Sequence, residues 1–307
     1  MINLGGQPKP YDNRDFQLGQ YQAPVPLPST YTTDVSTIKK LFQNGWPACG
    51  AHAGAHLKEV QEGVALSPEY LWRFIKLTDG FPPEIGTDIR SIMKTLQTWG
   101  VCEYDLLPND YTLNLTQYTH PIITDAEVAN AKPHSILSYA FDDYPTIQSV
   151  KQDIFQNKIA IFLIWCDDGF FGTDKPTFTQ KKYGHFVLGY GWSLDSFLIV
   201  DSTEVAFPLK EIPFTAISFI REVGTAIDLP DHFIFKNNLY LGCTYINSAL
   251  KEEVRQLQLR LGMAPADCIG VFGPKTLAAV IKYQLAHNIS PALGYVGSLT
   301  RTSLNTS

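Results

Sequence analysis

His185 and Asp201 lie sixteen residues apart, and the segment between them has the pattern of a β-hairpin. Two apolar runs, 185–191 and 197–201, flank a short polar turn, which is typical of paired antiparallel strands. If the turn centres near Ser193, His185 stands opposite Asp201 with Cβ atoms about 5 Å apart. An imidazole beside a carboxylate provides two members of a catalytic triad. A polar cross-strand pair at a sheet edge is the alternative interpretation.

Cys49 follows a turn-rich loop and precedes a run of small residues that favours a helix. Pro47 suits a first helical turn, so Cys49 is expected at or just before a helix N-terminus. The partial positive charge there favours the nucleophilic thiolate, and a backbone N–H can donate to a developing oxyanion. Gln43, six residues earlier, could supply a second donor. These residues predict nucleophilic catalysis by a thiol.

Gln43, Cys49 and the pair Gly184-His185 together resemble the papain-like cysteine peptidases in type, order and spacing. Segments 11–16 and 86–102 resemble the bacterial branch, and the resemblance covers roughly residues 11–222. It implies a two-lobed α+β fold, with a helical lobe, an antiparallel β lobe and an active-site cleft between them. It also implies a nucleophile at Cys49, a proton acceptor at His185, an orienting group at Asp201 and an oxyanion donor at Gln43.

Three positions depart from the pattern of that family. Gly50 stands where tryptophan or threonine is usual, Asp201 replaces an asparagine, and Trp46 replaces a disulfide-forming cysteine. An aspartate can still orient an imidazole and stabilise its cationic form. Gly50 and Asp201 are nevertheless the basis of an alternative hypothesis, a catalytically inactive papain-like scaffold that acts as a wall-binding protein.

The composition of the 307 residues is that of an ordinary globular protein, with 45% hydrophobic and 18% charged residues. A net charge of −6 argues against non-specific nucleic-acid binding. The longest apolar run, 159–166, predicts a buried strand and is too short to span a membrane. The five scattered cysteines suggest neither a disulfide framework nor a metal site. His52 and His56 lie one helical turn apart but lack a third ligand, so no metal or cofactor is expected.

Along the chain, residues 1–35 are rich in proline and glycine and predict an extended arm over the surface. This arm is too short for the helical inhibitory pro-segment of many papain-like zymogens, so no control of that kind is expected. Residues 36–222 are assigned to the peptidase domain, with helices at 49–62, at 68–76 capped by Ser67, and after a cap at Thr87 or Asp88. Residues 223–248 are expected to form a connector packed on that domain.

Residues 249–307 predict a separate domain of three helices, with apolar stripes and two glycine-rich turns. The runs 254–258, 270–276, 279–284 and 294–300 resemble the peptidoglycan-binding domain type 1. That resemblance implies peptidoglycan as a partner. Phe272, Tyr283 and Tyr295 could stack on sugar rings, and each could equally belong to the core.

The two resemblances together predict a peptidase that hydrolyses peptide bonds through a Cys–His–Asp triad at the bacterial cell wall. Its substrate would be a peptide of peptidoglycan or a protein at the cell surface. Residues 1–10 lack the pattern of a signal peptide, which predicts synthesis in the cytoplasm without a secretion signal. A bacteriophage lysin, a protein carried on the virion or a non-classical export route would each bring such a protein to the wall.

Overall fold

The structure, a computed structural model, describes residues 4–13, 15–17, 25–36, 38–120, 122–206, 208–228, 235–263 and 267–306. The chain forms two compact units, residues 1–229 and 230–307. Among the helices within these described ranges, none is both long enough and apolar enough to cross a membrane.

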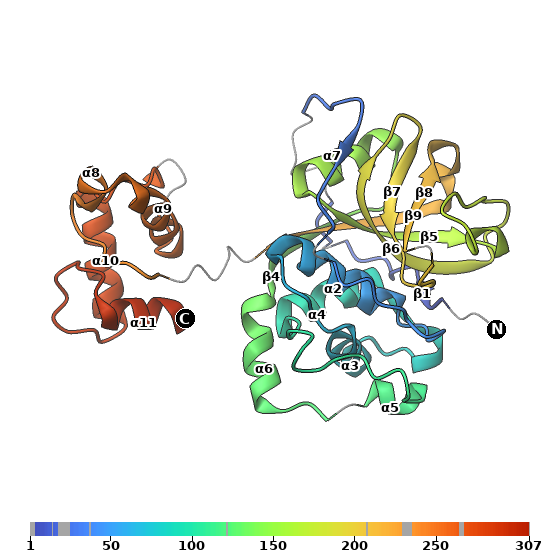
Figure 1. The fold of residues 1–307 in the computed structure, drawn as a ribbon, viewed down its shortest axis with the longest axis horizontal. Helices are drawn as coiled ribbons and strands as arrows, with labels where there is room; N and C mark the ends of the chain where they lie inside the picture. Colours follow the sequence, from blue (N-terminus) through green and yellow to red (C-terminus); the bar gives the residue numbers. More distant parts are fainter. Residues whose placement is uncertain are drawn as a thin grey trace. The chain divides into compact units, whose positions relative to one another are not determined.

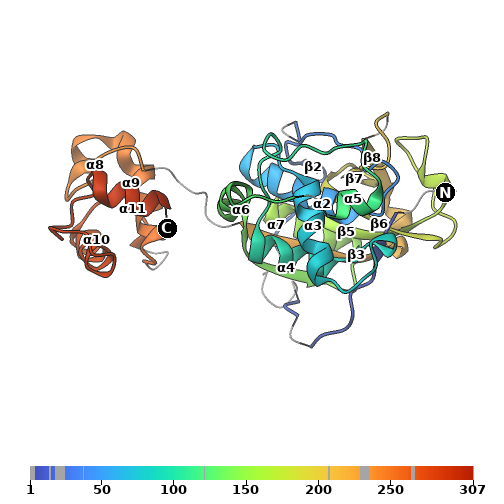
Figure 2. The ribbon, with the colours of Figure 1, turned by 90° about the horizontal axis from the view of Figure 1, so that it is seen from below.

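Helices gather on one side of the first unit, as Figures 1 and 2 both show. They are α2 (Cys49–Glu62), α3 (Pro68–Thr78), α4 (Ile89–Trp99), α5 (Leu115–Thr119) and α6 (Asp125–Ala131). The predicted cap of α3 is confirmed, because the Ser67 side chain accepts a hydrogen bond from the Tyr70 N–H at 3.1 Å. Asp88 caps α4 in the same way through the Ser91 N–H, which decides between the two caps considered.

A seven-stranded antiparallel sheet forms the other side of this unit. Its members are β2 (Tyr31–Thr32), β4 (Ile136–Asp142), β5 (Ala160–Cys166), β6 (Tyr183–Trp192), β7 (Ser196–Val200), β8 (Leu209–Pro213) and β9 (Ile220–Asp228). The strand order is β4-β9-β5-β6-β7-β8, and β2 pairs with β6. The predicted α+β arrangement of a helical lobe and an antiparallel lobe is confirmed.

Strand β5 explains why its sequence is apolar without alternation. Ile161 and Leu163 belong to the core shared with α2, α3 and α4, whereas Phe162 and Ile164 belong to a second core on the opposite face. Helix α7 (Ile147–Asn157) contributes Ile154 to that second core. Successive side chains of a strand point to opposite faces, so a strand covered on both faces is apolar throughout.

The N-terminal arm differs from the expected surface position. Strand β1 (Gly6–Gln7) pairs in parallel with β3 (Thr87–Asp88), and Leu4 and Lys9 are buried. The burial of Lys9 is explained by two ion pairs, since its ammonium lies 2.8 Å from carboxylate oxygens of both Asp15 and Asp143. Residues 1–3, 14 and 18–24 of the predicted arm lie outside the described ranges.

The boundaries near residue 222 and residue 249 also differ from the prediction. Residues 223–228 continue β9 inside the first unit's sheet, where they pair with β4 and β5. Phe235, Leu239 and Cys243 belong to the core of the second unit. Apolar side chains of the expected connector are thus divided between two cores; residues 229–234 lie outside the described ranges.

The second unit contains four described helices: α8 (Cys243–Ile246), α9 (Lys251–Arg260), α10 (Pro274–Ala286) and α11 (Ser298–Thr306). The last three lie where the sequence predicts helices. Val254, Leu257, Val280 and Leu304 from these helices form one buried core.

Candidate active site

His185 and Asp201 meet as the hairpin predicts, although through a different register. The pairing of β6 with β7 ends at Leu188 and Val200 and contains an irregularity between Gly189 and Gly191. Asp201 therefore reaches His185 from just beyond the end of β7, and the two residues are not a cross-strand pair. The Nε2 atom of His185 lies 2.8 Å from Oδ1 of Asp201, and both side chains are fully buried.

Charged and polar groups around Asp201 hold its carboxylate in place. Thr203 donates its backbone N–H to Oδ1 at 3.1 Å and its hydroxyl to Oδ2. The buried Lys210 ammonium lies 3.4 Å from Oδ2. Burial alone would raise the pKa of Asp201, but the bond with His185 and the charges of His185 and Lys210 outweigh it and lower that pKa.

The imidazole of His185 is stabilised in its cationic form. Burial alone would lower its pKa, but the hydrogen bond to Asp201 and the nearby Cys49 thiol raise the pKa to about 9. The ring of Phe170 packs edge-on against the imidazole, with centroids 5.5 Å apart.

Cys49 is the first residue of α2 and lies against β6, as the sequence predicts for a helix-end thiol. Its sulfur accepts a hydrogen bond from the backbone N–H of Phe186, the residue after His185, at 3.5 Å. The Nδ1 atom of His185 has no hydrogen-bond partner within the described residues, while Nε2 is held by Asp201. The nitrogen not engaged by the carboxylate is thus the one that remains for the thiol.

Gln43 is held beside the same helix end by two bonds of its side-chain amide. Nε2 donates to the carbonyl of Trp46 at 2.7 Å, and Oε1 accepts from the Ser202 hydroxyl at 2.8 Å. The Gln43 backbone N–H also donates to the carbonyl of Ser202 at 2.9 Å. Ser202 directly follows Asp201, so one short segment positions both residues.

Gly50 is explained by the packing at the start of α2. A Cβ atom at this position would lie 2.6 Å from Thr87 Cγ2 and 2.8 Å from Ile92 Cδ1. The residue after the cysteine is small because β3 and α4 pack directly on this turn. This departure therefore reflects local packing.

The N-terminal segment Leu4–Gln7 covers the thiol, which the sequence did not predict. The thiol of Cys49 donates a hydrogen bond to the Leu4 carbonyl, and the Thr87 N–H donates to the Gly5 carbonyl at 2.9 Å. A Cβ atom on Gly6 would lie 2.6 Å from the His185 backbone nitrogen. Cys49 and His185 both have no exposed surface.

Glycine is required where this segment passes. Gly5 has a φ of +75°, and a side chain there would overlap Pro47. A Cβ atom on Gly6 would also lie 2.7 Å from the carbonyl carbon of Gly184. Two consecutive glycines let the backbone approach the site this closely. Gly5-Gly6 in a proline-rich arm was the only sequence signal of this contact.

Lys210 was likewise missed, because a lysine in an amphipathic strand normally faces solvent. It is buried beside Asp201 and also contacts Glu204 at 2.8 Å. Burial lowers the pKa of His52 well below its usual value and that of His56 to about 4, so both rings are neutral. Within the described residues, no group of three or more His, Cys, Asp or Glu side chains is placed to hold a metal ion.

The three aromatic candidates of the second unit have different environments. Phe272 is fully buried in the core, which is the second of the two roles considered for it, and its ring has no exposed face for a ligand. Tyr283 packs at the edge of the core, with its ring 4.1 Å from that of His287 and its hydroxyl bonded to Ser303. Tyr295 is 45% exposed and lines a pocket.

Comparison with known proteins supports the fold of the first unit. No protein-family model matches the sequence, and no curated protein matches it. Among solved structures, xylellain, a cysteine protease from Xylella fastidiosa, matches with a TM-score of 0.64 and 17% identity over 74% of this chain and 97% of its own. Digestive procathepsin L2 proteinase from Tenebrio molitor larval midgut matches with a TM-score of 0.59 and 12% identity over 74% of this chain and 78% of its own. The Carica candamarcensis cysteine protease CMS1MS2, in complex with E-64, matches with a TM-score of 0.51 and 12% identity over 66% of this chain and 99% of its own. The chain therefore has the papain-like α+β fold found in these cysteine proteases.

Proposed function

We propose that the protein is a cysteine peptidase whose triad is Cys49, His185 and Asp201. The observation that carries this proposal is the buried His185–Asp201 pair, 2.8 Å apart, beside a thiol at the start of a helix. Asp201 fixes the imidazole through Nε2 and leaves Nδ1 for the thiol. The papain-like fold supports the same assignment.

The reaction follows from these positions. His185 takes the thiol proton, and the Cys49 sulfur attacks the peptide carbonyl carbon to form a tetrahedral intermediate. His185 then gives its proton to the leaving amine as the C–N bond breaks, which leaves a thioester on Cys49. Water, deprotonated by His185, hydrolyses the thioester and restores the thiol.

The oxyanion would be bound by the backbone N–H of Cys49 and by Gln43. The Gln43 amide nitrogen carries two N–H groups, and one of them is bonded to the Trp46 carbonyl. Ser202 holds the other end of the amide, so the donor keeps its orientation without substrate.

Substrate cannot reach Cys49 while Leu4–Gln7 occupies the site, so we infer that this chain folds in a latent form. The Leu4 carbonyl accepts the hydrogen bond of the thiol, and the Cys49 side chain has no exposed surface. Activity then requires displacement or removal of the segment. This control differs from that expected of a helical pro-segment, because a few extended residues suffice.

We further propose that the second unit binds peptidoglycan and holds the peptidase at the bacterial cell wall. The motifs of residues 254–300 support it, and tethering would raise the local enzyme concentration. The cleaved bond would lie in a peptidoglycan peptide or in a surface protein. A bacteriophage lysin or virion-carried enzyme fits this role. The alternative is an inactive wall-binding scaffold, which the complete burial of Cys49 favours.

The decisive experiment compares the full chain, a Gly6→Val variant and a Cys49→Ala variant. Each is incubated with purified sacculi and with denatured casein, and new amino termini are labelled and counted. A peptidase gives new termini with the Gly6→Val variant and none with Cys49→Ala. If no substrate is cut and an epoxide fails to label Cys49 in the Gly6→Val variant, the scaffold is correct.

A further inference from the structure

The second unit contains an internal repeat, of which α9 begins the first copy. Near the end of α9, the Gln258 amide donates to the Val271 carbonyl at 2.9 Å and to the Thr276 hydroxyl at 2.8 Å. Its oxygen accepts from the Gly270 N–H at 2.9 Å. One buried glutamine thus fixes the turn that leads into α10.

Gln284, near the end of α10, makes the same set of bonds. Its amide donates to the Tyr295 carbonyl and to the Thr300 hydroxyl, both at 2.9 Å, and its oxygen accepts from the Gly294 N–H at 2.8 Å. The turns repeat at a spacing of 24 residues, and Gly270 and Gly294 have nearly equal φ angles of +72° and +73°. These bonds therefore belong to the scaffold.

The two copies differ in side chains that take no part in these bonds. Tyr295 occupies the position of Val271, where only the backbone carbonyl is bonded, and Arg301 occupies the position of Leu277. The first copy forms the same turn without an aromatic ring or a cation at these positions. The turn itself requires neither side chain, and the Tyr295 ring stacks on that of Tyr240 with centroids 6.1 Å apart.

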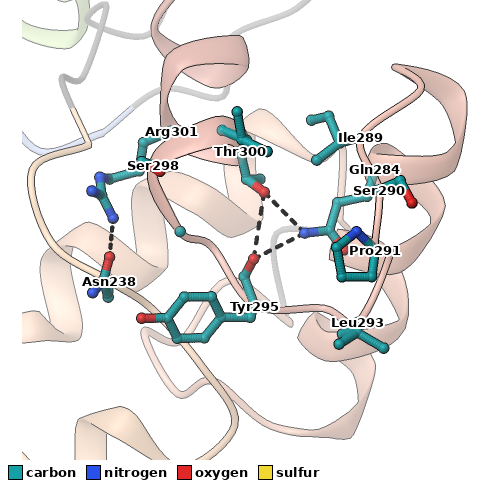
Figure 3. A pocket seen from close by; sticks show the side chains of 12 residues that line it. Asn238, Gln284, Ile289, Ser290, Pro291, Leu293, Tyr295, Ser298, Thr300 and Arg301 are labelled. Carbon is teal, nitrogen blue, oxygen red and sulfur yellow. Dashed lines mark hydrogen bonds between the residues drawn. The ribbon is translucent and has the colours of Figure 1, made fainter.

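Tyr295 and Arg301 line a pocket of about 560 Å³ beside the second turn. Leu293 and Leu299 add exposed apolar surface to its lining, and Asn238 adds an amide. Figure 3 shows the Arg301 guanidinium extending to Asn238, and the Gln284 amide bonded to Thr300 and Tyr295. The lining thus combines an aromatic ring, aliphatic side chains and one guanidinium.

Among the residues that the structure describes, Arg301 bonds to neutral acceptors, the Asn238 side-chain oxygen and the Val296 carbonyl at 3.4 Å. Within the described ranges, no carboxylate lies within 4 Å of it, whereas Arg255 and Lys275 of the same unit pair with Glu252 and Asp267. A guanidinium has five donors in a planar fork suited to carboxylates. Its charge is therefore available to a ligand.

The charge of the whole unit favours an anionic ligand as well. Residues 230–307 carry seven Lys and Arg residues and four Asp and Glu residues. Residues 1–229 carry 17 Lys and Arg residues and 26 Asp and Glu residues. The net charges are thus +3 and −9. A basic unit attached to an acidic one concentrates attraction for anions on the unit that holds the pocket.

We propose that this pocket binds a carboxylate of the peptidoglycan peptide stem, in which Arg301 pairs with the carboxylate and Tyr295 and Leu293 contact the neighbouring alanine methyl groups. This assignment rests on the proposed wall-binding role of the second unit. It names the part of the wall that is recognised, an acidic peptide with small apolar side chains. Bare sugar would not use the guanidinium charge.

The test uses the full chain with Cys49→Ala, so that a bound peptide stays intact. The probes are a soluble disaccharide–tetrapeptide with free carboxylates and the same molecule with its carboxylates converted to amides. Calorimetry measures the dissociation constant of each. Charge-assisted hydrogen bonds are worth about 1.5–3 kcal/mol, so Arg301→Leu weakens binding of the acidic probe about 10- to 150-fold. It leaves binding of the amidated probe nearly unchanged.

Arg301→Leu copies the first repeat and is expected to fold, and Tyr295→Val is a second variant of the same kind. Arg255→Leu is the matched control, because Arg255 lies on α9 and outside the pocket lining. Equal effects of the Arg301 and Arg255 changes, or equal affinity of the parent for both probes, overturn the subsite. Sedimentation with sacculi separates the two proposals. If the parent binds sacculi but does not prefer the acidic probe, the carboxylate subsite is overturned and the wall-binding role stands. If the parent binds neither sacculi nor the soluble probes, both proposals are overturned.

Discussion

Replacing Gly6 by valine tests whether the N-terminal segment controls access to Cys49. The new Cβ atom would lie 2.6 Å from the His185 nitrogen and 2.7 Å from the Gly184 carbonyl carbon. Both are backbone atoms inside β6, so they cannot rotate away as the end of a side chain would. The segment must therefore leave its position or distort the strand.

The magnitude follows from the cost of such an overlap. Inserting methyl groups into packed sites costs about 1–3 kcal/mol. Because the atoms that a Gly6 side chain would meet belong to the backbone and cannot rotate away, we expect a cost of about 2–3 kcal/mol here. Because each 1.4 kcal/mol changes an equilibrium tenfold, the displaced population rises about 30- to 150-fold. Leu4 leaves its buried position at the same time, and the Cys49 thiol loses its carbonyl acceptor.

The assay measures alkylation of Cys49 by iodoacetamide in the native protein, with peptide mass spectrometry to locate the label. The other four cysteines are buried and serve as internal references for unfolding. Gly6→Val should react about 30- to 150-fold faster than the parent at Cys49 only. Tyr11→Ala is the control in the same arm, because the Tyr11 side chain is 89% exposed.

An unchanged Cys49 rate in Gly6→Val, with an unchanged melting temperature, would refute the proposed latency. Equal acceleration at Cys102 or Cys166 would show general loosening of the unit. Faster alkylation of Cys49 in Tyr11→Ala would mean that the arm is loosely held. The overlap at Gly6 would then not be the cause of the faster alkylation in Gly6→Val.

Three further predictions concern the triad and the second unit. In a Gly6→Val background, Cys49→Ala should lower peptide turnover at least about 1000-fold without changing the melting temperature, and turnover near that of the parent would remove the peptidase assignment. In the same Gly6→Val background, Asp201→Asn removes the charge that helps to hold the pKa of His185 at about 9, so the high-pH limb of the rate profile, where the imidazolium loses its proton, should move to lower pH. A limb that stays in place would show that Asp201 does not tune His185. A Gly6→Val chain ending at residue 229 should keep cleavage of small peptides within about twofold, because the cores formed by the described residues of the two units have no residue in common. It should no longer sediment with sacculi, and equal sedimentation would place wall recognition in the first unit.

Local sequence patterns predicted the elements that hold the site, because each rests on short-range physics. Ser67 before Pro68 is a helix cap whatever the tertiary structure, and the predicted cysteine helix begins at Cys49 as expected. The hairpin was predicted from two apolar runs that flank a short polar turn. Its register was not, because the irregularity at Gly189–Gly191 depends on neighbouring strands.

Long-range contacts account for what the sequence did not reveal. Lys210 lies beside Asp201 only because β8 follows β7 in the sheet, which no residue pattern states. Val223–Asp228 looked like a connector because the strand's partners, β4 and β5, lie 60 or more residues earlier. Leu4 and Cys49 are 45 residues apart, and their contact depends on the pairing of β1 with β3.

The Leu4 carbonyl should inhibit Cys49 by a second effect besides obstruction. A carbonyl oxygen can only accept a hydrogen bond, so the Leu4 carbonyl engages the proton of the Cys49 thiol. While this bond persists, the proton is held away from Nδ1 of His185, the nitrogen that Asp201 leaves unoccupied. Displacing the segment therefore opens the site to substrate and also frees the thiol proton for transfer to His185.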